Sequence, residues 1–300
     1  MEKILFLGAG AVGATLIAQF LDANYPICVL CDINRKNKYL QSNFVVNRRQ
    51  YKFNFITKDE YRRTADIVII AVKYFNLQDA IRLLKGIVGE NTIIMSLLNG
   101  IDSEDIIAKK FNYSNLIFSF IYNIDAVRSN NVINYTKKGI IVFGEKNGQI
   151  SEKIIRVRDV FNIAKINYEI SKNILKRMWW KYMINIGMNQ TTAVLRAPYW
   201  VLQEICYSQE IARAAMKEVV QISQALNINL SQEDINKHFE RLMHFQPDGK
   251  TSMLQDVEAK RKTEVEMFSG KICQIGKKLN IQTPINKMFY ILIKSIESMY

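Results

Sequence analysis

Short apolar runs rich in β-branched residues recur through the first half of the chain. They occupy residues 3–8, 26–31, 65–72, 91–97, 116–122 and 140–144. Stretches with helical spacing, such as residues 76–88, lie between several of these runs. Continuous apolar strands that alternate with helices predict a parallel sheet covered by helices on both faces.

The pattern changes near residue 170, where apolar positions begin to recur three and four residues apart. Long helical segments are expected at residues 207–227, 252–280 and 284–299. We therefore predict an α/β domain over residues 1–168, followed by an all-α domain over residues 169–300.

Composition narrows the class of protein. A chain of 300 residues that is 49% hydrophobic and 23% charged is typical of a globular protein. No apolar run approaches the ~20 residues that cross a bilayer, so we expect no membrane partner. Four cysteines are too few for a disulfide framework in a chain of this length. We expect reduced thiols, no metal site and a cytoplasmic location.

The formal charge of +13 raises the alternative of a nucleic-acid-binding module. Lysine and arginine are scattered along the chain, however, and the densest clusters are mixed with acidic residues. A general basic bias also concentrates anionic small molecules near a protein. We therefore expect no nucleic-acid partner. The alternative, a non-catalytic basic or dinucleotide-binding module, predicts steeply salt-dependent DNA affinity.

A glycine-rich turn follows the first predicted strand and opens a helix. Its spacing is G-x-G-x-x-G, in which the glycines allow a tight turn, close approach of the backbone to a pyrophosphate and tight helix–strand packing. The N–H groups at the start of the helix then face the phosphates. We expect this turn to bind a dinucleotide through Gly8, Ala9, Gly10, Ala11, Val12 and Gly13.

Asp32 ends the second predicted strand, where an acidic side chain accepts hydrogen bonds from the adenosine ribose. Like charge would oppose a 2′-phosphate there, which favours NAD(H). Arg35 and Lys36 follow closely and are able to pair with such a phosphate, so NADP(H) stays open as the alternative.

Two further predicted loops leave the carboxyl ends of strands, where open α/β sheets bind ligands. One carries Lys73 and the other carries Asn99 and Gly100. The alternatives are a solvated lysine and an ordinary Asn-Gly turn.

In the predicted helix over residues 177–193, Lys181, Asn185 and Asn189 recur every four residues. They span only about 80° of one face. Asparagine is a poor helix former, and a buried lysine or amide without a partner is costly. A polar ligand site beside this face explains the three residues, while a solvated stripe remains the alternative.

Several segments together closely resemble the ketopantoate reductase family. They are "LGAGAVG" at 7–13, "VK" at 72–73, "NG" at 99–100, "WWKYMINIGMNQTTA" at 179–193 and "TSMLQDVEAKRKTEVEMFSG" at 251–270. The resemblance implies a Rossmann domain, a helical domain like the C-terminal domain of 6-phosphogluconate dehydrogenase, and an active site in the cleft between them. The implied enzyme is an NAD(P)-dependent oxidoreductase that reduces 2-dehydropantoate to (R)-pantoate for pantothenate and coenzyme A biosynthesis.

The resemblance also implies roles for the polar residues of the second domain. Lys181 matches the general acid, and Asn185 and Asn189 match the amides that bind the substrate hydroxyl. Ser252 matches a residue that binds the substrate carboxylate. Its spacing to Gln255 also fits a capping box that opens a helix.

Other matched positions concern the cofactor. Asn99 matches a residue that touches both nicotinamide and substrate, and Lys73 and Ala126 match positions along the cofactor. Glu264 matches an acidic residue of the active site near the cofactor. From spacing alone, Glu264 would be one half of an i,i+4 pair with Lys260.

Three departures from the family pattern leave alternatives open. The usual N-P-L-T-A is here "NQTTA" with Gln190, and Tyr199 stands where an asparagine often holds the substrate. Both suggest a related reductase of another 2-oxo acid. Asp32 replaces the arginine that better-known members use for the NADP phosphate. The sequence is compatible with either a monomer or a homodimer.

Overall fold

The chain forms two compact units, Met1–Ile174 and Leu175–Tyr300, in a computed structural model that describes residues 1–41 and 43–300. The first unit is α/β and the second is helical, as predicted. The predicted domain border at 168/169 stays a prediction.

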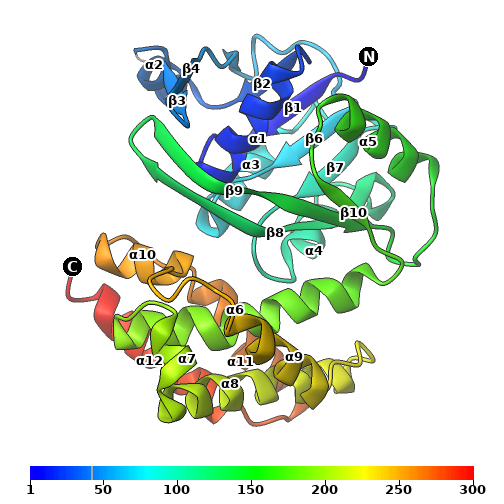
Figure 1. The fold of residues 1–300 in the computed structure, drawn as a ribbon. Helices are drawn as coiled ribbons and strands as arrows, with labels where there is room; N and C mark the ends of the chain where they lie inside the picture. Colours follow the sequence, from blue (N-terminus) through cyan, green and yellow to red (C-terminus); the bar gives the residue numbers. More distant parts are fainter. Residues whose placement is uncertain (42) are drawn as a thin grey trace. The chain divides into compact units, whose positions relative to one another are not determined.

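The first unit is built around one large sheet (Figure 1). Its strands are β1 (Ile4–Leu7), β2 (Ile27–Leu30), β3 (Phe44–Val46), β4 (Arg49–Tyr51), β5 (Phe55–Ile56), β6 (Ile67–Ile70), β7 (Ile93–Ser96), β8 (Leu116–Ser129), β9 (Val132–Gly144) and β10 (Tyr168–Ile170). Its helices are α1 (Ala11–Asp22), α2 (Ile33–Leu40), α3 (Leu77–Leu83), α4 (Ser103–Ala108) and α5 (Glu152–Ile163), with short 3₁₀ turns η1 (Tyr74–Asn76) and η2 (Tyr113–Asn115).

The sheet is mixed rather than wholly parallel. Its strand order is β4-β3-β9-β8-β7-β6-β1-β2-β5, with β10 paired to β9. The strands from β5 to β8 are parallel neighbours, but β8 and β9 form a long antiparallel hairpin and β3 pairs antiparallel with β4. The expectation of a parallel sheet was therefore wrong for the part of the sheet that contains the β8–β9 and β3–β4 pairs.

Alternate residues of each central strand enter opposite cores because side chains of a strand alternate between faces. In β1, Ile4 and Phe6 belong to one apolar cluster, whereas Leu5 and Leu7 belong to the other. Helices α1 and α5 cover the first face, and α3 and α4 cover the second. Both faces of the sheet are therefore covered by helices.

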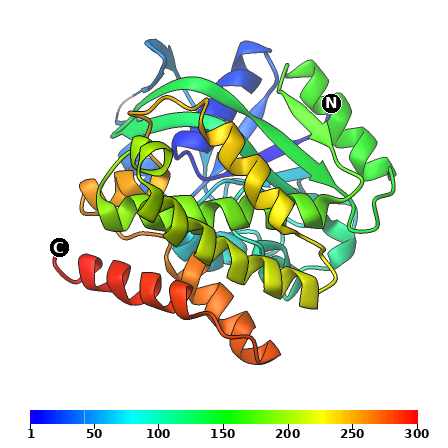
Figure 2. The ribbon, with the colours of Figure 1, turned by 60° about the horizontal axis from the view of Figure 1, so that its bottom comes forward.

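The second unit consists of helices (Figure 2). They are α6 (Ile174–Leu195), α7 (Trp200–Glu204), α8 (Cys206–Ala225), α9 (Gln232–Leu242), α10 (Ser252–Glu258), the π-helical turn η3 (Glu266–Gly270), α11 (Lys271–Leu279) and α12 (Pro284–Glu297). Within residues 1–41 and 43–300, none of the helices combines the length and apolar character that crossing a membrane requires.

The single helix expected over residues 252–280 is broken after α10. Lys260 adopts a left-handed φ of 50°, and the N–H of Arg261 donates back to the carbonyl of Asp256 at 2.8 Å. The N–H and hydroxyl of Thr263 then both donate to Oε1 of Glu297 on α12, at 2.7 and 2.6 Å. These contacts turn the chain before η3, so the next residue, Glu264, does not lie on α10.

Candidate active site

The carboxyl ends of the parallel strands bring four predicted residues to one edge of the first unit. Leu7, Ile70 and Ser96, the last residues of β1, β6 and β7, are in register across the sheet. The segments that follow β1, β2, β6 and β7 carry, in that order, Gly8, Asp32, Lys73 and Asn99. This is the edge at which open α/β sheets bind ligands.

The three glycines of the turn have different physical roles. Gly8 has a φ of +98°, and a Cβ there would lie 2.5 Å from the carbonyl oxygen of Ala71. A Cβ on Gly13 would lie 2.1 Å from the carbonyl oxygen of Gly8. A Cβ on Gly10, by contrast, would meet nothing within 4 Å. The protein itself does not need a glycine at this position, but a bound pyrophosphate would, so the turn fits a dinucleotide.

Gly10→Ala tests this reading of the turn. Gly10 has a φ of −70°, which alanine adopts without strain, so the melting temperature should stay unchanged. Overpacking against a bound pyrophosphate should weaken NADH binding by roughly ten- to hundredfold. Calorimetric titration with NADH measures the effect, and unchanged affinity would show that no phosphate approaches Gly10.

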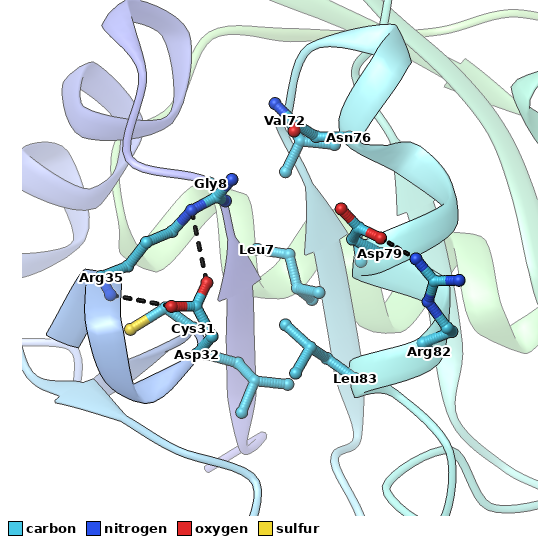
Figure 3. A pocket seen from close by; sticks show the side chains of 12 residues that line it. Leu7, Gly8, Cys31, Asp32, Arg35, Val72, Asn76, Asp79, Arg82 and Leu83 are labelled. Carbon is cyan, nitrogen blue, oxygen red and sulfur yellow. Dashed lines mark hydrogen bonds and ion pairs between the residues drawn. The ribbon is translucent and has the colours of Figure 1, made fainter.

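A pocket of about 350 Å³ opens beside the glycine turn (Figure 3). It is lined by Leu7, Gly8, Leu30, Cys31, Asp32, Arg35, Val72, Asn76, Asp79, Ala80, Arg82 and Leu83. Apolar side chains form its floor, and charged side chains stand at its sides in Figure 3. This combination suits a nucleoside, which has a flat apolar base and polar ribose hydroxyls.

Asp32 caps α2 at the side of this pocket. Its Oδ1 accepts a hydrogen bond from the N–H of Arg35 at 2.8 Å, and its Oδ2 lies 3.4 Å from Nε of the same arginine. Lys36 is paired with Glu60, whose pKa falls to about 2 because it accepts hydrogen bonds from Lys36 and from the N–H of Thr57. Both cations that follow Asp32 are therefore already matched by carboxylates.

The polar face of α6 lies in the second unit. Lys181 is half-buried, and burial lowers its pKa to about 8, against the opposing effect of the negative charge of Glu264. Nδ2 of Asn185 is buried and has no hydrogen-bond partner among the described residues. Asn189 is buried, and its Nδ2 donates to Oγ of Ser252 at 3.5 Å. The expected lysine, amides and serine therefore lie together, and the solvated-stripe alternative does not describe this face.

Two details of this cluster differ from the interpretation by spacing. Thr251, not Ser252, caps α10, because its Oγ1 accepts from the N–H of Leu254 at 3.2 Å and lies 2.7 Å from Oγ1 of Thr192. Ser252 therefore does not cap the helix. It is solvent-exposed, and its Oγ contacts Asn189. Glu264 is buried and follows the break after α10, so it is not one half of a helical pair with the residue four positions earlier.

The two departures in the second domain have structural explanations. Gln190 is fully buried on another side of α6, where Oγ of Ser269 donates to its Oε1 at 2.5 Å and its Nε2 donates to the carbonyl of Ile186 at 3.0 Å. Gln190 is therefore part of the helical core. It no longer supports the hypothesis of a reductase for another 2-oxo acid. Tyr199 precedes α7 and packs against Gly249 and the ring of Phe245.

Ala126, which the family resemblance led us to expect along the cofactor, lies at a β-bulge in β8. Sequence reasoning missed other residues that line the pocket. Asn76, Asp79 and Arg82 line the pocket from the segment that follows β6, and only their closeness to Lys73 in the chain points to them. No cluster of three or more His, Cys, Asp or Glu side chains suited to a metal ion occurs within residues 1–41 and 43–300.

The fold places the protein in the class of two-domain proteins in which a Rossmann-type α/β domain precedes an all-helical domain. Residues 4–148 match the model of the family "Ketopantoate reductase PanE/ApbA", and residues 173–297 match "Ketopantoate reductase PanE/ApbA C terminal". The chain belongs to the ketopantoate reductase family.

Individual relatives agree with this assignment over almost the full chain. A 2-dehydropantoate 2-reductase of Pyrococcus abyssi is 27% identical over 99% of this chain and 98% of the relative. One of Aquifex aeolicus is 26% identical over 98% and 97%. A structure of D-mandelate dehydrogenase with NADH and anilino(oxo)acetate has a TM-score of 0.89, 19% identity and 99% coverage of both chains. The similarity to D-mandelate dehydrogenase shows a shared fold only.

Proposed function

We propose that this protein is an NAD(P)H-dependent oxidoreductase that reduces 2-dehydropantoate to (R)-pantoate, a step toward pantothenate and coenzyme A. The observation that carries the proposal is the polar face of α6. There a lysine with a lowered pKa stands beside an amide whose buried Nδ2 has no partner among the described residues. Family membership and the names of the relatives support the substrate.

In this reaction each polar side chain has one task. The ammonium group of Lys181 donates a proton to the oxygen that develops negative charge at C2 of the substrate. A pKa near the working pH suits a general acid, because the group must be protonated and still release its proton readily. Glu264 raises the pKa of Lys181 by its charge and so keeps the acid protonated.

The other groups of the helical unit bind the substrate. The amides of Asn185 and Asn189 hydrogen-bond the substrate hydroxyl, and the hydroxyl of Ser252, next to Asn189, binds its carboxylate. A substrate oxygen would satisfy the buried Nδ2 of Asn185, which otherwise costs about 1–3 kcal/mol.

The first unit binds the cofactor through its glycine turn, Asp32, Lys73, Asn99 and the backbone at Ala126. The reduced nicotinamide, when bound, supplies the hydride for C2. The open space at Gly10 and the pocket beside Asp32 are the features that fit a dinucleotide.

NADH is the proposed reductant, because a 2′-phosphate would meet the carboxylate of Asp32 and find Arg35 and Lys36 already paired. Asp32→Asn tests the charge alone, because asparagine also caps a helix well. We expect kcat/KM for NADPH relative to NADH to rise roughly tenfold in this variant. Asp22→Asn, which removes the same charge where Arg49 and Tyr51 bind it, is the control and should leave the ratio unchanged.

A second candidate, a reductase of another 2-oxo acid, is favoured only by Tyr199. Loss of NADH absorbance with 2-dehydropantoate and with a panel of 2-oxo acids separates the two by kcat/KM. The proposal predicts the highest value for 2-dehydropantoate. A higher value for another 2-oxo acid would establish the second candidate. A cytoplasmic location, and a monomer or homodimer, stay predictions.

A further inference from the structure

Arg128, near the tip of the β8–β9 hairpin, holds the backbone of the glycine turn. Its Nη1 donates to the carbonyl oxygen of Ala9 at 2.5 Å, although 119 residues separate the two in sequence. Its Nε donates to the carbonyl of Asn130 at 2.5 Å, and its Nη2 lies 3.4 Å from Oδ1 of Asn131. Figure 1 shows the hairpin reaching to this part of the first unit, where β9 pairs with β3.

Two aromatic rings lie close to the guanidinium of Arg128. Its Cζ lies 5.3 Å from the ring centroid of Phe44 and 5.6 Å from that of Tyr39. The residue is half-buried, and its side chain combines these ring contacts with its hydrogen bonds. An arginine offers several donors in one rigid plane, which a lysine does not.

The contact with Ala9 sets the direction of the peptide that joins Ala9 to Gly10. In a trans peptide the C=O and the N–H point in opposite directions, and no cis peptide bond occurs in residues 1–41 and 43–300. Because the carbonyl of Ala9 points to Arg128, the N–H of Gly10 points away from it. Gly10 is the N-cap of α1, the end of the helix at which unsatisfied N–H groups bind anions.

We propose that Arg128 is a positioning residue for dinucleotide binding: its hydrogen bond to Ala9 holds the Ala9–Gly10 peptide with its N–H directed at the cofactor pyrophosphate. This inference rests on the proposed dinucleotide cofactor. It does not depend on the identity of the 2-oxo acid. It assigns to the long hairpin a role in ordering the glycine turn, beyond the cofactor contact expected at Ala126.

The test compares Arg128→Met, Arg128→Lys and the matched control Arg49→Met by calorimetric titration with NADH and with ADP. Arg49 likewise contacts an aromatic ring, Tyr51 at 5.3 Å, and pairs with Asp22, so its loss removes the same charge elsewhere in the unit. Hydrogen bonds from charged groups support an expected loss of roughly tenfold or more in affinity for both ligands in Arg128→Met. Melting temperatures and far-ultraviolet circular dichroism verify that each variant is folded.

The outcomes separate the alternatives. Arg128→Lys should recover only part of the affinity, because one ammonium group cannot make the three contacts of the guanidinium with Ala9, Asn130 and Asn131. Full recovery by lysine would show that charge alone matters and would overturn the positioning role. Unchanged affinity in a folded Arg128→Met, or an equal loss in Arg49→Met, would also overturn it. Wild-type protein that binds neither NADH nor ADP would instead refute the proposed cofactor, and the inference with it.

Discussion

Lys181→Ala should lower kcat for ketone reduction by about 10²–10⁴-fold, because this is the contribution typical of a positioned general acid. NADH binding should persist, since the glycine turn and the pocket beside Asp32 belong to the other unit. Steady-state kinetics with 2-dehydropantoate and calorimetric titration with NADH measure the two effects. Near-normal turnover would remove Lys181 from the mechanism.

The pH dependence of the reduction rate provides an independent test of Lys181 as the general acid. Only the ammonium form donates a proton, and the pKa of Lys181 is lowered to about 8 by burial. The rate of reduction should therefore be constant below this pKa and fall as the pH rises through it. Lys237→Ala is the control, because this lysine forms an exposed i,i+4 pair with Glu233 on α9. It should show the wild-type rate and profile.

Glu104→Gln should remove a large pH dependence of stability from the first unit. Glu104 is 1% exposed, and burial raises its pKa from 4.5 to about 7, although Oγ of Ser103 donates to its Oε2 at 2.9 Å. Its Oε1 has no hydrogen-bond partner among the described residues. A carboxyl whose pKa is raised by folding binds its proton more tightly in the folded state. The wild type should therefore lose stability as the pH rises from about 4.5 to 7, by about 3 kcal/mol at most.

The measurement is urea unfolding, followed by circular dichroism, at pH 5 and pH 8.5. Glutamine does not ionise, so the variant should match the wild type at the lower pH and exceed it at the higher pH. Glu90→Gln, at an exposed site, controls for the change in net charge. An identical fall in stability between the two pH values in wild type and Glu104→Gln would contradict the assignment.

Periodic and local signals in the sequence led to the right elements. The glycine spacing after a strand predicted the tight turn that opens α1, and the recurrence of Lys181, Asn185 and Asn189 predicted the polar face of α6. Each signal works because one face of one element repeats regularly along the chain.

Contacts between distant segments were out of reach. No local rule joins Arg128 to Ala9, or Ser103 and Glu104 to a buried position. The strands β8 and β9 were expected to cover only residues 116–122 and 140–144, because their distal halves are largely solvent-exposed and lack an apolar run.

Some local choices were degenerate. Thr251 and Ser252 are both good caps, and only the packing of Thr251 against Thr192 decides between them. The helical spacing of residues 252–280 did not indicate the turn at Lys260. The turn is stabilised by a hydrogen bond from the N–H of Thr263 to Glu297, which lies on α12, far away in the sequence.

The helix cap at Asp32, together with its proposed role in coenzyme choice, would limit how that choice can be re-engineered. Introducing arginine directly at this position would supply a cation for a phosphorylated coenzyme, but it would also remove the oxygen on which α2 begins, at a cost of about 1 kcal/mol. A conversion that places serine or asparagine at position 32 and relies on the released Arg35 keeps the helix start intact. Helix initiation and the proposed nucleotide discrimination thus depend on the same side chain, and a change in one must accommodate the other.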